Sequence, residues 1–357
     1  MNAEPSNSVS TAQILQEAKA KHKVPGMAVV VMKDGVVCDR AVAGVRKNGA
    51  PDVITTNDLF HIGSCTKSMT ATLVATYVEE GRLSWDTTIA SVLPELKGKM
   101  NEAYEKVTIE QLLTHRGGVP GSPPTLAWIQ AWGKKGTPTQ QRYEFIKAVL
   151  SKAPEAKPGE KFIYSNQGYA IAGAMLEKIT GQAWETLMTN KIFKPLSMDT
   201  TGFGVPGTEG KIDQPWGHAK RFGKIRALQE DNPPAIGPAG TVHGSLDDIA
   251  RFALAHMKGE REGGIVKRET FRKLHTAPQG GDYAFGWGCS KTPQAGTLLS
   301  HAGSNTMFYL LMWVAPEKDL LIITAVNMGG DPAEQATLDV TRALRDKWLT
   351  VKGADLH

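Results

Sequence analysis

The chain has 357 residues, 41% of them hydrophobic and 22% charged, and carries a formal net charge of +5. At roughly 150 residues per domain, this length predicts about two domains, or one large composite domain, with an ordinary soluble core. No dense Lys/Arg block is present and no apolar run approaches the roughly 18 residues of a membrane span, so neither a nucleic-acid partner nor a membrane span is expected.

The N-terminal part predicts a helix, a hairpin and a second helix. Residues 9–22 read as the first helix. Residues 26–45 follow as a β-hairpin, because Asp34-Gly35 between two apolar runs is typical of a two-residue turn. A long amphipathic helix begins at the polar cluster of residues 64–67 ("SCTK") and ends at Gly81, a good C-cap.

The middle of the chain, roughly residues 85–265, predicts helices joined by loops. Thr108 is a possible N-cap for "IEQLL", which runs into a Gly/Pro loop. The segment "NQGYAIAGAMLEKIT" predicts a helix closed by Gly181, and "LDDIARFALAHMK" predicts another between Ser245 and Gly259.

After residue 280 the pattern changes to short apolar segments separated by turns, "YAFGWGCS", "GTLLSHAG", "TMFYLLMWVA" and "DLLIITAVN", followed by a helix at 332–349. Such a series indicates an antiparallel sheet. The fold class is therefore predicted as α+β, a sheet built from both chain ends, flanked by terminal helices, with a mostly helical insertion. We expect a discontinuous sheet domain (1–60 plus 266–357), a helical domain (61–265) and a site at their junction.

Ser64 and Lys67 form the first candidate for chemistry. Positions i and i+3 share a helix face, so the ammonium can reach the hydroxyl, and a helix N-terminus favours the anion formed during nucleophilic attack. Gly63 would allow a tight turn before the helix. The alternative is that Ser64 is an N-cap and Lys67 a solvated surface residue, since Ser-x-x-Lys is expected roughly once by chance in such a chain.

Tyr164 and Asn166 form the second candidate. In a loop before a helix, they can bring a phenol and an amide into one cleft, where the phenol could shuttle a proton and the amide could bind a substrate carbonyl. The alternative is a buried Tyr164 and an Asn166 that caps the following helix.

His301-Ala302-Gly303-Ser304 is the third candidate, and its position singles it out. It ends one predicted strand, and the next begins at about Thr306. Gly303 would let a substrate lie against the strand edge, and a following backbone N–H could point at an oxyanion.

These motifs in this order, SCTK, then YSN about 100 residues later, then HAG near the C-terminus, resemble those of the serine β-lactamase and penicillin-binding-protein superfamily. The Tyr-x-Asn form is similar to that of class C β-lactamases, D-alanyl-D-alanine carboxypeptidases and related esterases. "LLTHRGGVP" and "HAGSNTMFYLLMWVAPE" also resemble family segments, and the resemblance covers roughly residues 10–345.

The resemblance implies an acyl-enzyme mechanism. Ser64 would be the nucleophile, and Lys67 would help to deprotonate it or hold its alkoxide. Tyr164 would be the general base in acylation and pass the proton to the leaving group. Asn166 would orient the substrate and Lys67.

The same resemblance places His301 where most class C β-lactamases carry the Lys of Lys-Thr-Gly, and assigns the oxyanion hole to the backbone N–H groups of Ser64 and Ser304. A His is only partly charged near neutral pH, which disfavours a substrate carboxylate. We therefore expect a carboxylesterase acting on small-acyl esters. A D-alanyl-D-alanine carboxypeptidase or D-aminopeptidase, a class C-like β-lactamase and a non-turnover penicilloyl-binding or structural relative remain alternatives.

No cofactor is expected. Three cysteines form no CxxC pair and nine histidines are scattered without His-Glu-x-x-His, which disfavours a disulfide framework and a metal site. The partner is thus a small-molecule ester, amide or β-lactam, and the oligomeric state stays open. The start "MNAEPSNSVS" lacks the apolar region of a secretory signal, so a cytoplasmic protein is expected, or a periplasmic one if a signal has been removed.

Overall fold

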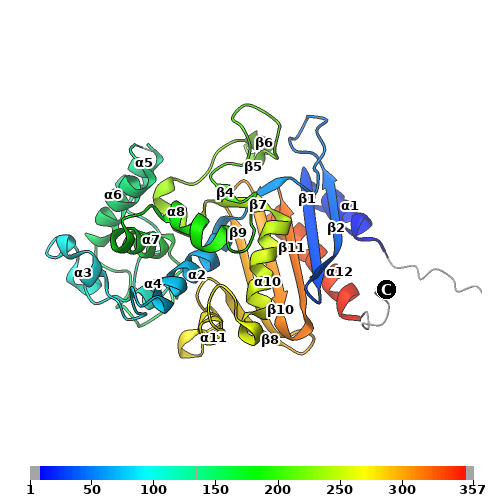
Figure 1. Ribbon diagram of the computed structural model, residues 1–357. Helices are drawn as coiled ribbons and strands as arrows, with labels where there is room; N and C mark the ends of the chain where they lie inside the picture. Colours follow the sequence, from blue (N-terminus) through cyan, green and yellow to red (C-terminus); the bar gives the residue numbers. More distant parts are fainter. Residues whose placement is uncertain (1–8, 134, 351–357) are drawn as a thin grey trace, which may run out of the picture.

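The computed structural model describes residues 9–133 and 135–350. Its centre is a six-stranded antiparallel sheet in the order β2-β1-β11-β10-β9-β8, which joins strands from both chain ends (Figure 1). The predicted α+β class, with a sheet from both ends and a largely helical insertion, is confirmed. The proposed division into two domains stays a prediction.

The strands of this sheet are β1 (Gly26–Lys33), β2 (Val36–Gly44), β8 (Gly288–Thr292), β9 (Gly296–Ser304), β10 (Tyr309–Ala315) and β11 (Leu320–Val326). Two small sheets consist of β3 (Leu59–His61), β7 (Val242–Ser245) and β4 (Gly202–Phe203), and of β5 (Gly217–Arg221) and β6 (Lys224–Leu228).

The helices are α1 (Thr11–His22), α2 (Thr66–Glu79), α3 (Ile89–Val92), α4 (Ile109–Leu113), α5 (Thr125–Trp132), α6 (Pro138–Leu150), α7 (Asn166–Thr180), α8 (Trp184–Met188), α9 (Gly237–Gly240), α10 (Leu246–Glu262), α11 (Arg268–Leu274) and α12 (Asp331–Thr350). A short 3₁₀ turn, η1 (Gly63–Cys65), leads into α2. None of the helices in the described ranges is both long and apolar enough to cross a bilayer.

The sheet is covered on both faces, which explains its nearly continuous apolar strands. Successive residues of β1 alternate between two cores: Val29 packs with α1 and α12, whereas Val30 packs in the larger core that continues into the helical part. Every residue of β11 is buried. Helix α10 lies across the second face, against β11 and β1, and Figure 1 shows it in front of the sheet.

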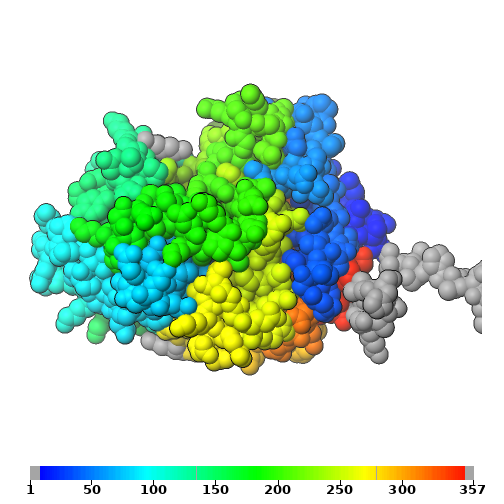
Figure 2. Space-filling model, in the orientation of Figure 1, coloured from blue at the N-terminus to red at the C-terminus, as the bar shows by residue number. Residues whose placement is uncertain are grey.

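The helical part lies directly beside the sheet. Figure 2 shows the cyan and green segments packed against the yellow and blue ones without a gap between them. Helix α2 contacts α7, α8 and α9 on the helical side. The 3₁₀ turn before it contacts β9 and β10, so the start of α2 lies where the two parts meet.

Most predicted elements are present, with small shifts at their ends. The hairpin turn lies at Asp34-Gly35, Thr108 caps α4 in a capping box, and Gly181 ends α7 in the left-handed region at φ +71°. Helix α10 passes Gly259, where we expected its end: a Cβ there would lie 2.3 Å from the Phe271 ring, so this glycine permits close packing on α11.

The segment "YAFGWGCS" contributes less strand than expected. It forms an isolated bridge between Tyr283 and Gly288, and β8 begins only at Gly288. Gly286 bends the chain at φ +82°, and a Cβ on it would lie 2.3 Å from the backbone nitrogen of Ser68. This turn therefore presses against the first turn of α2, the helix that begins at the candidate site.

Candidate active site

Three segments far apart in the sequence meet at the start of α2. The turn η1 carries Ser64, the first turn of α7 carries Asn166, and the end of β9 carries residues 301–304. The Lys67 ammonium group, which is fully buried, joins the first two. The SCTK, YSN and HAG motifs therefore lie together in the structure, as expected from the sequence. The roles of their residues stay predictions.

Ser64 does not cap α2. Neither η1 nor α2 has a side-chain cap hydrogen bond, and the N-cap residue of α2 is Cys65. The alternative reading of Ser64 as a capping residue is therefore wrong. Its hydroxyl instead lies 3.0 Å from Lys67 Nζ. Cys65 is fully buried, and burial raises the pKa of its thiol, so the neighbouring sulfur is a packing group.

Lys67 has three oxygen neighbours. Its Nζ lies 3.0 Å from Ser64 Oγ, 2.7 Å from Asn166 Oδ1 and 3.0 Å from the carbonyl oxygen of Ala239. Burial lowers the pKa of the amine from 10.5 to about 7. A solvated surface position for Lys67, the other alternative, is therefore excluded.

The neutral amine is matched to these neighbours. The Asn166 and Ala239 oxygens can only accept, so they take the two N–H bonds of an uncharged –NH₂. When the amine is protonated, Nζ donates to Ser64 Oγ as well. When it is uncharged, its lone pair is left for the Ser64 hydroxyl, which can donate to it. With a pKa of about 7, both forms are present near neutral pH.

Tyr164 stands at the mouth of the site. Its side chain is 38% exposed, so the alternative of a buried packing residue is wrong. Lys67 Nζ lies 4.7 Å from the centre of its ring. Burial of the phenol raises the pKa of Tyr164 to about 12, against an opposing contribution from the Ser64 hydroxyl. The phenol therefore keeps its proton at neutral pH.

Asn166 is the first residue of α7, and it is not the cap. Ser165 is the N-cap residue and accepts from Gly168 N, which leaves the Asn166 amide free to turn toward Lys67. The capping alternative for Asn166 is wrong for this reason. The backbone N–H of Ser165 in turn donates to His115 Nδ1 at 3.1 Å.

His115 was not predicted as a site residue, although it lies in the "LLTHRGGVP" segment. It has a left-handed backbone at φ +58°, and its ring centre lies 4.4 Å from that of Tyr164. Burial lowers the pKa of His115 well below its ordinary value, so the imidazole is neutral. It supports the loop that carries Tyr164 by packing and by the bond to Ser165.

His301 is also neutral. Its Nδ1–H donates to the Ala302 carbonyl at 2.6 Å, which leaves Nε2 to accept from the Tyr283 hydroxyl at 3.1 Å. Burial lowers the pKa of His301 to about 3. Tyr283, an aromatic residue that the sequence offered either for lining a cleft or for packing, is a second neighbour of the site outside the predicted site residues.

The end of β9 is unpaired on one edge and lies against η1. Strand β8 pairs with β9 only as far as Ser300, so residues 301–304 have no partner on that side within the part of the chain that the structure describes. The backbone of β9 instead packs on η1: a Cβ on Gly303 would lie 2.7 Å from Ser64 N, and one on Gly63 would lie 2.2 Å from Ser304 N. The two predicted oxyanion donors therefore come from segments in direct backbone contact.

The Ser304 side chain is engaged within its own turn. Its hydroxyl donates to the Phe308 carbonyl at 2.6 Å and accepts from the Thr306 N–H at 2.9 Å. Only the backbone of Ser304 is thus offered to the site. Among the described residues, no cluster of three or more His, Cys, Asp or Glu side chains is placed to hold a metal ion.

A Gly303→Ala variant is expected to lose both stability and activity. The new Cβ would lie 2.0 Å from the Ile62 carbonyl oxygen, so β9 and η1 must separate. Overpacking of this kind costs about 1–3 kcal/mol. Thermal unfolding and ester hydrolysis measure the two losses.

The matched control is Gly281→Ala, at φ −70°, where the nearest atom to a new Cβ is 3.4 Å away. It should change the free energy of unfolding by no more than about 0.5 kcal/mol. Equal behaviour of the two variants would contradict the close contact of β9 with η1.

The sequence matches the family model described as Beta-lactamase over residues 11–346. Penicillin-binding protein 4 of Amycolatopsis lactamdurans is 31% identical over 242 residues, which are 67% of this chain and 61% of that protein. Protein flp of Staphylococcus aureus (strain COL) is 22% identical over 321 residues, 89% of this chain and 62% of that protein. The chain thus spans about three fifths of the length of these curated relatives.

Solved structures share the fold. The octameric penicillin-binding protein homologue from Pyrococcus abyssi superposes with a TM-score of 0.78 at 28% identity, covering 94% of this chain and 76% of that chain. D-amino acid amidase from Ochrobactrum anthropi SV3, in complex with L-phenylalanine amide, superposes with a TM-score of 0.76 at 20% identity, covering 94% of this chain and 98% of that one.

Proposed function

Because the chain belongs to the beta-lactamase family, we propose that it is a serine hydrolase that forms an acyl-enzyme on Ser64, and that it acts as a carboxylesterase on esters of small acyl groups. The observation that carries the proposal is the pairing of the Ser64 hydroxyl with the Lys67 amine at 3.0 Å. Burial brings the pKa of that amine to about 7, so a large fraction is an uncharged base at neutral pH.

Acylation begins when Lys67 Nζ takes the proton of Ser64 and Oγ attacks the substrate carbonyl carbon. The carbonyl electrons move to the oxygen, and the backbone N–H groups of Ser64 and Ser304 hold this oxyanion. When the bond to the leaving group breaks, that group needs a proton. Tyr164, a neutral phenol between Lys67 and solvent, passes it on. This assignment gives the base role to Lys67, because a pKa of about 12 disfavours Tyr164 for it.

Deacylation repeats these steps with water as the nucleophile. Lys67, which has returned its proton through Tyr164, accepts a proton from the attacking water. The second tetrahedral oxyanion uses the same two N–H groups. Its collapse breaks the bond to Oγ, which recovers a proton from Lys67, and the carboxylic acid leaves. Asn166 keeps the amine oriented throughout, since its Oδ1 accepts one N–H at 2.7 Å.

The lack of positive charge on His301 supports an uncharged substrate. The imidazole is buried with a pKa of about 3, and its two nitrogens are engaged with Ala302 and Tyr283. A leaving group that carries a carboxylate, as in a D-alanyl-D-alanine peptide or a β-lactam, therefore gains no positive charge from this position. An uncharged ester needs none.

A second candidate is the hydrolysis of an amino-acid amide. An amine leaves only after protonation, and the neutral phenol of Tyr164 can supply that proton. D-amino acid amidase and a D-stereospecific amidohydrolase from Streptomyces sp. share the fold at 20% and 22% identity. This candidate uses the same catalytic groups and is distinguished only by substrate.

The test compares the acetate esters of phenol and of hydroxybenzoate, which differ by a carboxylate on the leaving group. We expect kcat/KM to be at least about tenfold higher for the neutral ester. The His301→Lys variant supplies a cation and should shift the ratio of the two kcat/KM values toward the anionic ester.

An unchanged ratio in His301→Lys, or a wild-type preference for the anionic ester, would contradict the esterase assignment. A stoichiometric burst without steady-state turnover would favour the non-turnover relative instead. The experiment therefore separates neutral from anionic ester substrates, and turnover from stoichiometric acylation.

A further inference from the structure

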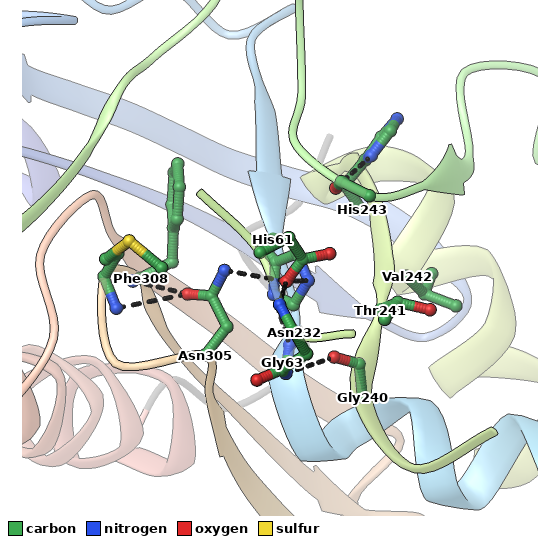
Figure 3. A network of polar contacts seen from close by, with 12 residues as sticks. His61, Gly63, Asn232, Gly240, Thr241, Val242, His243, Asn305 and Phe308 are labelled. Carbon is green, nitrogen blue, oxygen red and sulfur yellow. Dashed lines mark hydrogen bonds and ion pairs between the residues drawn. The ribbon is translucent and has the colours of Figure 1, made fainter. Parts of the chain in front are cut away.

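A buried carboxylate lies behind the two oxyanion segments. Asp231 is 3% exposed, and its Oδ1 is 2.8 Å from His61 Nε2 and 3.1 Å from Asn305 Nδ2. His61 lies two residues before Gly63, and Asn305 directly follows Ser304. Figure 3 shows Asn305 directed toward His61 across this network. One carboxylate therefore joins both segments whose backbone N–H groups face the substrate oxygen.

His61 transmits this contact to η1. Its Nδ1 accepts the Gly63 N–H at 3.0 Å, so the ring proton is on Nε2, the nitrogen that faces Asp231. The ring is fully buried. The Gly63 peptide, which precedes the Ser64 N–H, is thus held by an imidazole whose Nε2 lies 2.8 Å from the carboxylate, in a close contact that lacks hydrogen-bond geometry.

Asn305 transmits the contact to the end of β9. Its Oδ1 accepts the N–H groups of Met307 and Phe308 at 3.2 and 3.0 Å, while its Nδ2 donates to Asp231. Asn305 is 3% exposed. The turn that follows Ser304 is therefore fixed from inside by the amide and anchored to the same carboxylate.

A third connection leads to the base. The Asn232 N–H donates to Asp231 Oδ1 at 2.7 Å, and its side-chain Nδ2 donates to the Gly240 carbonyl at 2.7 Å. The adjacent Ala239 carbonyl accepts from Lys67 Nζ. The carboxylate of Asp231 thus connects η1, the end of β9 and the peptide that orients Lys67.

Burial of this carboxylate has a cost. Its Oδ2 has no hydrogen-bond partner among the residues that the structure describes. A buried charge without full pairing is destabilising, so the desolvation cost of Asp231 offsets much of what its contacts contribute to stability. We therefore relate the network to the three segments that it brings together at the site.

We propose that Asp231, acting through His61 and Asn305, is a positioning residue that holds the Ser64 and Ser304 N–H groups in the geometry of the oxyanion hole. The proposal rests on the proposed function, because it concerns the same acylation step. It implies that losing Asp231 weakens binding of a tetrahedral oxyanion more than binding of the planar ester.

The experiment uses Asp231→Asn, with Asp248→Asn as the matched control. Asp248 is equally buried at 2% exposure and accepts from Thr200 N at 2.7 Å, but it lies at the start of α10 and touches neither oxyanion segment. We measure kcat and KM for phenyl acetate, the Kd of phenylboronic acid, whose adduct with a serine oxygen is tetrahedral, and the Tm.

Asp231→Asn should lower kcat roughly 10- to 100-fold and weaken boronic acid binding by a similar factor, with little change in KM. Asp248→Asn should change Tm at least as much and leave kcat and boronic acid affinity near those of the wild type. If the two variants differ only in Tm, the positioning role is overturned while the proposed function stands. If the wild type neither hydrolyses the ester nor binds phenylboronic acid, the proposed function fails and the positioning role fails with it.

A pair of His61 variants keeps the test decisive if Asp231→Asn folds poorly. Asn side chains bond the backbone N–H two residues ahead, so His61→Asn can still hold the Gly63 N–H, whereas His61→Ala cannot. We expect His61→Asn to bind phenylboronic acid more tightly than His61→Ala and to have the higher kcat. Equal values for both would contradict the role of His61 in holding Gly63.

Discussion

Replacing Ser64 by alanine is expected to abolish ester hydrolysis, with kcat lowered by at least about 10⁴-fold. Oγ is the atom that we propose to form the covalent bond, and its hydroxyl is the group paired with Lys67 Nζ. The side chain caps neither η1 nor α2, so its loss should leave the fold intact. Steady-state hydrolysis of a short-chain p-nitrophenyl ester, wild type beside Ser64→Ala, measures the effect.

The control for this prediction is the unfolding temperature of Ser64→Ala, which should stay close to that of the wild type. Activity that survives in a folded Ser64→Ala protein would mean that another group does the chemistry. If Ser64→Ala loses both activity and fold, Ser64 has a structural role, which would contradict the expectation drawn from the absence of a capping hydrogen bond.

Replacing Lys67 by methionine is expected to lower kcat/KM by about 10²- to 10⁴-fold, the usual contribution of a general base. Wild-type kcat/KM should rise with pH through about 7, as the buried amine loses its proton. The residual activity of Lys67→Met should lack this rise with pH. A pH–rate profile of both proteins tests this, and an unchanged rise in Lys67→Met would assign the pKa to another group.

The same variant makes a stability prediction with a definite sign. The unfolded chain holds the Lys67 proton up to a pKa of 10.5, whereas the folded chain releases it near 7. Between these values the unfolded state binds more protons, so this group makes the free energy of unfolding rise with pH. Denaturant titrations across this range should show the rise in the wild type and its loss in Lys67→Met.

Much of the fold follows from local signals in the sequence. The Asp34-Gly35 turn, the Thr108 cap and the αL glycine at 181 are set by interactions within a few residues, and they lie where predicted. The end of α10 and the start of β8 lie elsewhere than predicted, because Gly259 and Gly286 permit close packing against Phe271 and Ser68, contacts that local patterns do not encode.

The candidate site also contains some groups that sequence motifs indicate and others that they do not. The three motifs contain the side chains that come together in the fold. Lys67 and Asn166, for example, form a hydrogen bond although they lie 99 positions apart in the sequence. Tyr283 and Ala239 carry no local pattern that connects them with the motifs: Ala239 acts through its backbone carbonyl, 172 positions from Lys67. Backbone groups of this kind become visible only when the segments are brought together.

Roles that depend on burial were also beyond the sequence. Only the structure reveals that Lys67 is fully buried, which moves its pKa into the range of a base, and that burial keeps His301 neutral. The expected base, Tyr164, changes its proposed role to that of a proton donor for the same reason. Desolvation is a property of the assembled fold.

The most direct measurement is mass spectrometry of the protein quenched during turnover of a slow acetate ester, with the modified peptide sequenced. The account predicts one added acetyl group, located on Ser64 and absent from Ser64→Ala. A Lys67→Met protein mixed with the same ester should acquire the acetyl group more slowly. An acetyl group on any other residue, or turnover by the wild type without a covalent adduct even under rapid quenching, would contradict the acyl-enzyme mechanism on Ser64.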